Sequence, residues 1–352
     1  MLLLMNNLRS FLAIAAAGIT FFSCGKSTPN VQPAVTAQPT AVSSEDRSTL
    51  PPQPTADERA AFWKFWGDGN GEISSYKTTQ LRYGELRHGY DVMIFVTEEI
   101  SRKTRIKVES DKIPKDDRVP VLKLNRVSKF PTGIYDYSLL ASVFSSVEPE
   151  LGNHPLQALK VSNTVQEWCG SFFGMWHTNA NALAYTRHSY FESEGDTDNM
   201  QFQIPSGDWE YEDNLPILIR DLKGEWMKMG ETKTIELLPS FQHQRFTHDK
   251  IQFLPATVTK SDGGSIAVGG KTYPSTIHWR WSYADDNESF PEGSKNVTED
   301  YWTEAAYPHR ILKWESSDGS NGELLVSKRL PYWKLHDNAH DNLRDEFKIP
   351  EN

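Results

Sequence analysis

The chain has 352 residues, with 37 Lys and Arg against 47 Asp and Glu, and a formal net charge of −10. This acidic balance and the lack of a long basic run exclude a nucleic-acid binder and an electrostatic binder of anionic lipid, because both need clustered cations. The two cysteines, Cys24 and Cys169, would join a leader boundary to the domain interior if paired, so a disulfide scaffold is excluded as well.

Residues 1–23 have the pattern of an export signal. Arg9 supplies a positive charge, and the apolar run that follows is about 12 residues long, which is shorter than the ~20 residues of a spanning helix. The run ends in Ser23 and Cys24, as a lipobox does. We therefore predict cleavage before Cys24, lipidation of its thiol and attachment to a membrane through that lipid. The alternative is an ordinary signal peptide followed by a buried cysteine.

The residue after the predicted lipidation site, Gly25, does not match the signal that retains bacterial lipoproteins in the inner membrane. We therefore expect an exported protein, lipid-anchored at the outer membrane on its periplasmic or surface face. Residues 24–56 contain six prolines among many Ser, Thr, Ala and Gln residues. Such a composition cannot bury enough apolar surface to order the chain, so it predicts a disordered tether.

A helix is the first element predicted in the folded part. Asp57 and Glu58 supply the acidic residues typical of a helix start, and Phe62 and Trp66 recur at helical spacing. The glycine-rich stretch 67–71 is expected to end this helix.

Strand signals dominate the N-terminal half, taken as residues 57–200. A gap at 98–102 is short enough to close a hairpin between two of the predicted strands. The strands predicted in this half are 91–98, 102–109, 118–130, 134–147, 160–165 and 182–192.

The C-terminal half, taken as residues 201–335, begins with a short predicted helix over 213–222, and residues 336–352 read as a polar tail. The strands predicted in this half are 232–238, 248–260, 264–268, 276–282, 310–315 and 323–330. Short strands separated by turn signals predict a mainly β fold with antiparallel pairing and few helices.

A resemblance adds to this prediction. The stretch 257–334, with Tyr301-Trp302, the run 308–315 and the strand 325–330, resembles the end of periplasmic proteins related to the lipoprotein-carrier half-barrels. The resemblance implies a clam-like half-barrel, in which a curved antiparallel sheet wraps a short helix, and 213–222 is similar to that helix.

The first half resembles a group of uncharacterised bacterial lipoproteins through residues 132–137 and through the string 166–170. Some of that group carry the label "septum formation inhibitor Maf", a class of nucleotide pyrophosphatases with a Ser-x-Ser-Pro-Arg-Arg signature. That signature is absent from the sequence, so the resemblance does not carry this activity to the chain.

Aromatic residues of the predicted half-barrel are the candidate ligand-binding residues. At alternating positions of one strand, Trp279, Trp281 and Tyr283 share one sheet face. With Trp302 and Trp314 they would line an apolar concave face that holds a lipid or another envelope component. Core packing is the more common use of such residues and remains the alternative. We therefore expect a non-enzymatic binding or assembly module, with no cofactor.

A surface hydrolase is the alternative function. Cys169 with His177 or His188 would give a thiol nucleophile and its base, provided that the fold brings them together. The carboxylates considered for general acid and base roles are Asp91, Glu167, Asp208 and Glu210. A hydrolase would show converging carboxylates or a Cys–His contact, whereas a binding module would show an open cavity without them.

Three patterns imitate ligand sites, and we predict no metal or phosphate site from them. His336 and His340 would share one face of a helix, but a third ligand is missing and the segment is polar. The acidic stretches 68–72 and 192–199 do not have the spacing of a calcium loop. Residues 265–272 end in Gly-Lys-Thr, but they lack the leading glycine of a phosphate loop and predict a hairpin turn.

Overall fold

The computed structural model describes residues 53–350 apart from 152–153, 195–196, 249 and 285–295. The predicted signal peptide, the predicted lipidation site Cys24 and nearly all of the predicted tether lie outside these residues. Across the described residues, every helix is too short or too polar to cross a membrane. Residues 49–352 form one compact unit, to which both predicted halves contribute.

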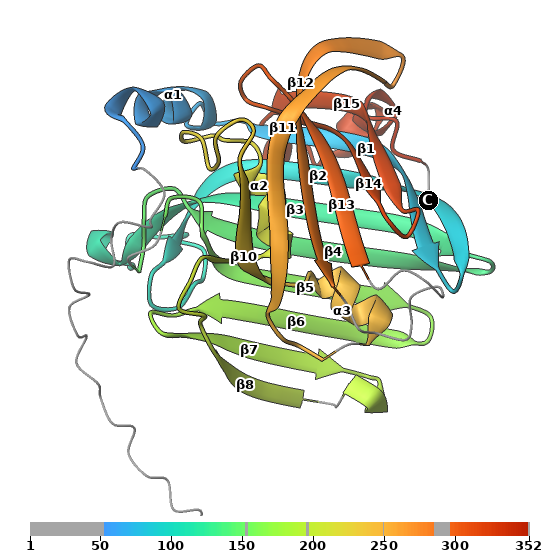
Figure 1. Cartoon of the computed structure of the whole chain (residues 1–352), viewed down its shortest axis with the longest axis horizontal. Helices are drawn as coiled ribbons and strands as arrows, with labels where there is room; N and C mark the ends of the chain where they lie inside the picture. Colours follow the sequence, from blue (N-terminus) through green and yellow to red (C-terminus); the bar gives the residue numbers. More distant parts are fainter. Residues whose placement is uncertain (1–52, 152–153, 195–196, 249, 285–295, 351–352) are drawn as a thin grey trace, which may run out of the picture. The chain divides into compact units, whose positions relative to one another are not determined.

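Fifteen strands form a single curved sheet that does not close on itself (Figure 1). The spatial order runs from β8 back to β1, then from β15 back to β9, so β1 and β15 join the two halves. Neighbouring strands pair antiparallel, except that β9 and β10 are parallel. The mainly β fold class and the curved, open antiparallel sheet predicted from the sequence are confirmed.

The strands of the first half form a meander in which each strand pairs with the next. They are β1 (Gly71–Arg82), β2 (Glu85–Ser101), β3 (Arg118–Thr132), β4 (Tyr135–Ser146), β5 (Ala158–Glu167), β6 (Gly170–Thr178), β7 (Ala182–Ser189) and β8 (Thr197–Gln203).

The strands of the second half follow the same meander rule from β10 onward. They are β9 (Trp209–Tyr211), β10 (Thr232–Leu238), β11 (Leu254–Val268), β12 (Lys271–Ala284), β13 (Asn296–Glu304), β14 (Ile311–Ser316) and β15 (Asn321–Leu330).

The helical segments of the described chain are short. The α-helices are α1 (Ala56–Trp66), α2 (Leu215–Leu218), α3 (Phe241–Thr247) and α4 (Asn342–Glu346). The 3-10 turns are η2 (Lys115–Asp117), η3 (Glu192–Glu194), η4 (Glu212–Asn214), η5 (Tyr332–Lys334) and η6 (Asn338–His340).

The predicted first helix is confirmed as α1. Thr55 caps it, because its hydroxyl accepts a hydrogen bond from the backbone N–H of Glu58 while the Glu58 carboxylate accepts one from the backbone N–H of Thr55. Its apolar face buries Phe62 and Trp66, and the Trp66 ring packs on Phe95 of the sheet.

The strand predicted over 102–109 is wrong. These residues form turns, with a single backbone bridge between Ile100 and Lys107, and the partner of β2 is β3. Ile106, an apolar residue of this segment, is 64% exposed. Strands β1, β6, β8, β9 and β13 and the helices α3 and α4 were not predicted.

The concave side of the sheet is filled by η4, α2 and α3, which we together call the inner segment. The predicted helix over 213–222 is present in shortened form as α2, whose Leu215 and Ile217 are completely buried. These side chains belong to one apolar core that also includes Trp176 of β6 and Trp279 of β12. The sheet therefore holds its core, and any internal site, on this side.

The C-terminal segment lies on the opposite, outer face of the sheet. Phe347, just after α4, is 5% exposed and packs in a separate apolar cluster with Ile73 of β1 and Val92 of β2. This segment covers part of the outer face, away from the concave side.

Candidate functional site

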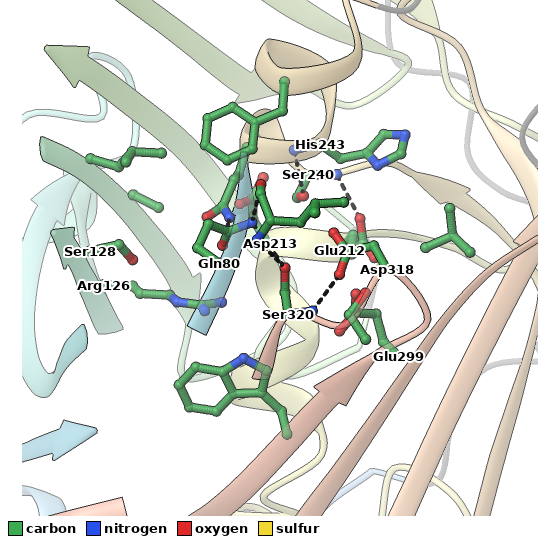
Figure 2. Close-up of a pocket in the computed structure, with 18 of the residues that line it drawn as sticks. Gln80, Arg126, Ser128, Glu212, Asp213, Ser240, His243, Glu299, Asp318 and Ser320 are labelled. Atoms are coloured by element: carbon green, nitrogen blue, oxygen red, sulfur yellow. Dashed lines mark hydrogen bonds between the residues drawn. The ribbon is translucent and has the colours of Figure 1, made fainter. Parts of the chain in front are cut away.

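A cavity of about 380 Å³ opens on the concave side of the sheet, between β3–β4 and β12–β14. The turn η4 and the helix α3 reach into it from the inner segment (Figure 2). Its walls mix aromatic rings with carboxyl, hydroxyl and amide groups, and this mixture distinguishes it from the apolar core behind it.

Three stacked rings form one side of the cavity, which we call the aromatic floor: Trp281 of β12, Tyr301 of β13 and Trp314 of β14. The ring centroids of Trp281 and Tyr301 are 4.8 Å apart, and those of Tyr301 and Trp314 are 5.9 Å apart, with nearly parallel planes. Strand alternation directs all three rings inward. The Trp314 indole lies against Gly322 of β15, where a Cβ atom would overlap it, so this strand position requires glycine.

Glu212 of η4 connects the aromatic floor to the inner segment. Its carboxylate accepts hydrogen bonds from the Trp281 indole N–H at 2.9 Å, from the Tyr283 hydroxyl at 3.2 Å and from the backbone N–H of Ser240 at 2.8 Å. The side chain is buried, so these donors replace the water that a carboxylate would otherwise bind. Glu212 thus fixes the start of α3 against β12.

Two further carboxyl groups face the cavity with raised pKa values. Burial raises the pKa of Asp213 to about 7, against the effect of the backbone N–H of Phe241, which donates to it at 3.0 Å. Burial, followed by the negative charge of Glu212, raises the pKa of Glu299 well above its ordinary value. A carboxyl group that keeps its proton near neutral pH both donates and accepts hydrogen bonds.

Arg126 of β3 brings a positive charge to the cavity, but a partner already holds it. Its Nε donates to Asp91 at 2.6 Å, and its guanidinium lies 4.8 Å from the Trp314 ring centroid. On the other side, Asp318 accepts a hydrogen bond from the backbone N–H of Ser320 at 2.7 Å. The lining therefore contains more acidic than basic groups, and Figure 2 shows Glu212, Glu299 and Asp318 gathered on one side.

The predicted ligand-binding aromatics divide between three environments. Trp281, Tyr283 and Trp314 line the cavity. Trp279 is completely buried and stacks on Trp226, with 5.8 Å between ring centroids, so it belongs to the core. Trp302 lies on the other face of β13, stacked on His278 at 4.7 Å.

The candidate thiol, Cys169, is exposed in the turn between β5 and β6. Glu167 lies beside it, and the hydrogen bond and charge of this carboxylate raise the pKa of the thiol, which disfavours the nucleophilic thiolate. His177 lies at the far end of β6, and the His188 ring stacks on Phe173.

The candidate carboxylates each have a different neighbour. Asp91 pairs with Arg126, Glu167 accepts from the backbone of Cys169, Asp208 pairs with Lys233, and Glu210 pairs with His154. Within the described ranges, no cluster of three His, Cys, Asp or Glu residues could hold a metal ion. The segment with His336 and His340 contains the 3-10 turn η6 rather than an α-helix, so the spacing argument for this pair does not apply.

Sequence reasoning missed the acidic lining of the cavity, namely Glu212, Asp213 and Glu299, together with Arg126. A usable signal exists for one of them, because Val297, Glu299 and Tyr301 alternate along β13 and must share a face. A carboxyl group between two inward apolar residues is a recognisable exception to the pattern.

Comparison with known proteins adds no further constraint: no family model, curated protein or solved structure matches the chain. The chemistry must therefore be inferred from the cavity itself. Its aromatic floor offers apolar ring surface, and its protonatable carboxyl groups offer hydrogen bonds in both directions.

Proposed function

We propose that the domain is a non-enzymatic binding module of the cell envelope, anchored to a membrane through lipid on Cys24, which holds a polyhydroxylated ligand in the cavity. The observation that carries the proposal is the placement of Asp213 and Glu299, two carboxyl groups with raised pKa values, in the cavity that the aromatic floor lines. Sugar hydroxyls are matched by groups that donate and accept, and sugar C–H faces pack on aromatic rings.

The composition of the lining favours a sugar over an acyl chain. An acyl chain in this cavity would cover Asp213 and Glu299 without offering them further hydrogen bonds, which costs free energy for every group left unpaired. The cavity volume of about 380 Å³ also lies in the usual range for small-ligand sites. The ligand is then a free glycan or the sugar headgroup of a glycolipid, which share this chemistry.

A hydrolase is the second candidate, and one observation favours it. Carboxyl groups with raised pKa values are suited to general acid catalysis, and Asp213 and Glu299 are two such groups in one cavity. The binding experiment below distinguishes the two functions, because a hydrolase would release a shortened product from the same ligands.

The proposal is tested by measuring binding of mono- and oligosaccharides to the chain from residue 24 onward, using ligand-observed NMR and calorimetry. We expect Glu299→Leu to weaken binding roughly tenfold or more, because it leaves ligand hydroxyls unpaired, and Glu299→Gln to weaken it only slightly, because the amide still donates and accepts. Glu323→Leu, at an exposed position of β15, is the matched control and should leave affinity unchanged.

A second arm of this experiment offers the same sugars as headgroups in glycolipid micelles. Tighter binding to the micelles than to the free sugar would identify a glycolipid, and equal binding would identify a free glycan. Binding that survives Glu299→Leu, or no binding in either arm, would overturn the proposal.

A further inference from the structure

Five large apolar side chains are strongly exposed at the hairpin ends of the first half, and we call them the apolar rim: Tyr83, Leu86, Ile134, Trp168 and Tyr190. Their exposed fractions are 57%, 52%, 81%, 72% and 75%. Among the described residues, Ile134, Tyr190 and Trp168 are the three most exposed large hydrophobic side chains. Single exposed apolar residues are common, but a group of them indicates a contact surface.

The strand register brings all five side chains to one end of the sheet. They lie in or beside the β1–β2 turn, the β3–β4 turn, the β5–β6 turn and the end of β7. The pairs Tyr90↔Lys129, Ser138↔Gln166 and Phe172↔Ser189 show that these ends adjoin one another across neighbouring strands. In Figure 1 the same turns gather at the right of the view.

Contacts between neighbouring turns connect several members of the apolar rim. Tyr135 links two of its members, because its hydroxyl donates to that of Tyr83 at 3.5 Å and its ring lies 6.2 Å from that of Trp168. Tyr190 lies directly against Gly170, where a Cβ atom would overlap the tyrosine ring. The rim is thus a packed surface on short, regular hairpins rather than a set of separate side chains.

The apolar rim also borders the cavity. Tyr83 belongs to both, since it and Gly84 line the cavity at the β1–β2 turn. Phe246 of α3 lines the cavity at the same end, with its ring 6.1 Å from that of Tyr137. A surface that docks against the rim is therefore adjacent to the ligand site.

We propose that the apolar rim docks into the headgroup region of a lipid bilayer, beside the cavity. Its mixture of Trp, Tyr, Ile and Leu is the mixture found where proteins meet the boundary between headgroups and acyl chains. The net charge of −10 gives the chain no general attraction to anionic lipid, so apolar insertion must supply the affinity.

The length of chain before the domain supports this choice of partner. About 30 residues separate the predicted lipid on Cys24 from the first described residue, which at ~3.1 Å per residue would reach ~90 Å when extended. A lipid at Cys24 would therefore keep the rim within reach of the membrane, at a high local concentration there. Ile134 and Leu86 offer no ring for sugar stacking, which favours a bilayer over a glycan polymer at this surface.

The test uses the chain from residue 24 onward with Cys24→Ser, because an attached lipid would itself bind vesicles. Cys169, beside Trp168 in the rim, is then the single thiol and takes an environment-sensitive NBD label. With vesicles of phosphatidylcholine and phosphatidylethanolamine, we expect a blue shift and quenching by spin-labelled lipids of shallow depth. The control label is Asp111→Cys with Cys169→Ser, at the opposite end of the β2–β3 pair, where no change is expected.

Flotation with the same vesicles measures the contribution of the rim. The combined substitution Ile134→Ser, Trp168→Ser and Tyr190→Ser should lower vesicle binding roughly tenfold or more, because three large apolar side chains are lost from the inserted surface. Ile106→Ser removes an apolar side chain that is 64% exposed at the opposite end, and should change binding less than about twofold.

Three outcomes would overturn the membrane assignment. The first is no vesicle binding by the parent chain, and the second is equal binding by the parent and the rim variant. The third is that the rim binds another partner instead of vesicles, as shown by a rim-dependent shift to dimers in light scattering or by rim-dependent retention on polysaccharide. None of them bears on sugar binding in the cavity, which Glu299→Leu tests separately. Absence of sugar binding by the parent chain, with intact vesicle binding, would instead overturn the proposed function and leave the docking surface in place.

Discussion

The aromatic floor and the apolar rim use similar residues in opposite environments. Trp314 of the floor is 4% exposed and stacks on Tyr301, whereas Trp168 of the rim is 72% exposed at the end of a hairpin. Trp314 lies within β14 and Trp168 lies in the β5–β6 turn of the same sheet, so the amount of tryptophan in the sequence does not separate core from surface. We infer that the aromatic floor contributes to the stability of the fold, whereas the apolar rim is available for contact with an external partner.

The largest expected effect is on the free energy of unfolding when a ring of the floor is removed. Trp314→Ala should lower it by about 3–5 kcal/mol, because it leaves a cavity and removes the stacking partner of Tyr301. Trp168→Ala in the rim should lower it by less than about 0.5 kcal/mol, since the side chain is mostly in water already. Urea titration followed by circular dichroism measures both, and similar losses in the two variants would break the comparison.

A smaller effect is expected for the carboxylate that binds the floor to the inner segment. Glu212→Ala leaves the Trp281 indole N–H and the backbone N–H of Ser240 without their acceptor, and should cost about 2–4 kcal/mol. Glu85→Ala, next to the rim and 66% exposed, should cost less than about 0.5 kcal/mol.

The same urea titration compares Glu212→Ala with Glu85→Ala, and Glu212→Gln sharpens the result because its amide oxygen can still accept one of the donors. We expect the Gln variant to be intermediate in stability between the parent and Glu212→Ala. A Gln variant as unstable as the Ala variant would show that the negative charge, and not the acceptor, holds α3 against β12.

The parts of the fold that could be predicted from the sequence have strictly alternating apolar residues along a strand or clear turn residues. Trp281 and Tyr283 were placed on one face of β12 because they alternate, and the two-residue turn at Gly269 and Gly270 was predicted from its glycines, both of which have positive φ. Where alternation was imitated by an irregular segment, as at 102–109, the prediction was wrong.

The missed strand β1 shows why polar composition hides some buried strands. Glu72 and Ser74 are both nearly inaccessible, because partners elsewhere in the chain satisfy them: Arg220 pairs with Glu72 at 2.9 Å, and Ser327 accepts from Ser74 at 2.9 Å. Such partners lie far away in sequence, so local pattern reading treats these residues as exposed.

The candidate site was the least predictable feature for the same physical reason. Local hydrophobicity predicts that carboxyl groups are exposed to solvent, yet Asp213 and Glu299 face the cavity. Their pKa values are raised there mainly by burial, which outweighs the effect of any nearby cation. The side chains gather from η4 and β13, which come together only in the folded sheet. A single sequence does not contain that juxtaposition.

The smallest effect we predict is on the pH dependence of stability, and it sharpens the comparison between cavity and rim carboxyl groups. Burial raises the pKa of Asp213 to about 7, above its unfolded value of 3.8, so its contribution to stability is complete below the unfolded pKa and is lost as the pH rises through 7. Between pH 6.5 and 8.5, Asp213 should account for a loss of about 0.8 kcal/mol, which is the last part of a larger loss that begins at the unfolded pKa.

Asp213→Asn should remove that loss and flatten the stability profile over this range, because the amide does not ionise yet can still accept from the backbone N–H of Phe241. Asp136→Asn, on the exposed β3–β4 hairpin, is the matched substitution and should leave the slope as it is in the parent. Starting at pH 6.5 keeps the protonation of His177, whose pKa burial lowers to about 4, out of the measurement. An unchanged slope in Asp213→Asn would mean that the Asp213 carboxyl is hydrated in the open cavity, and the hydrogen-bonding argument for a sugar ligand would then rest on Glu299 alone.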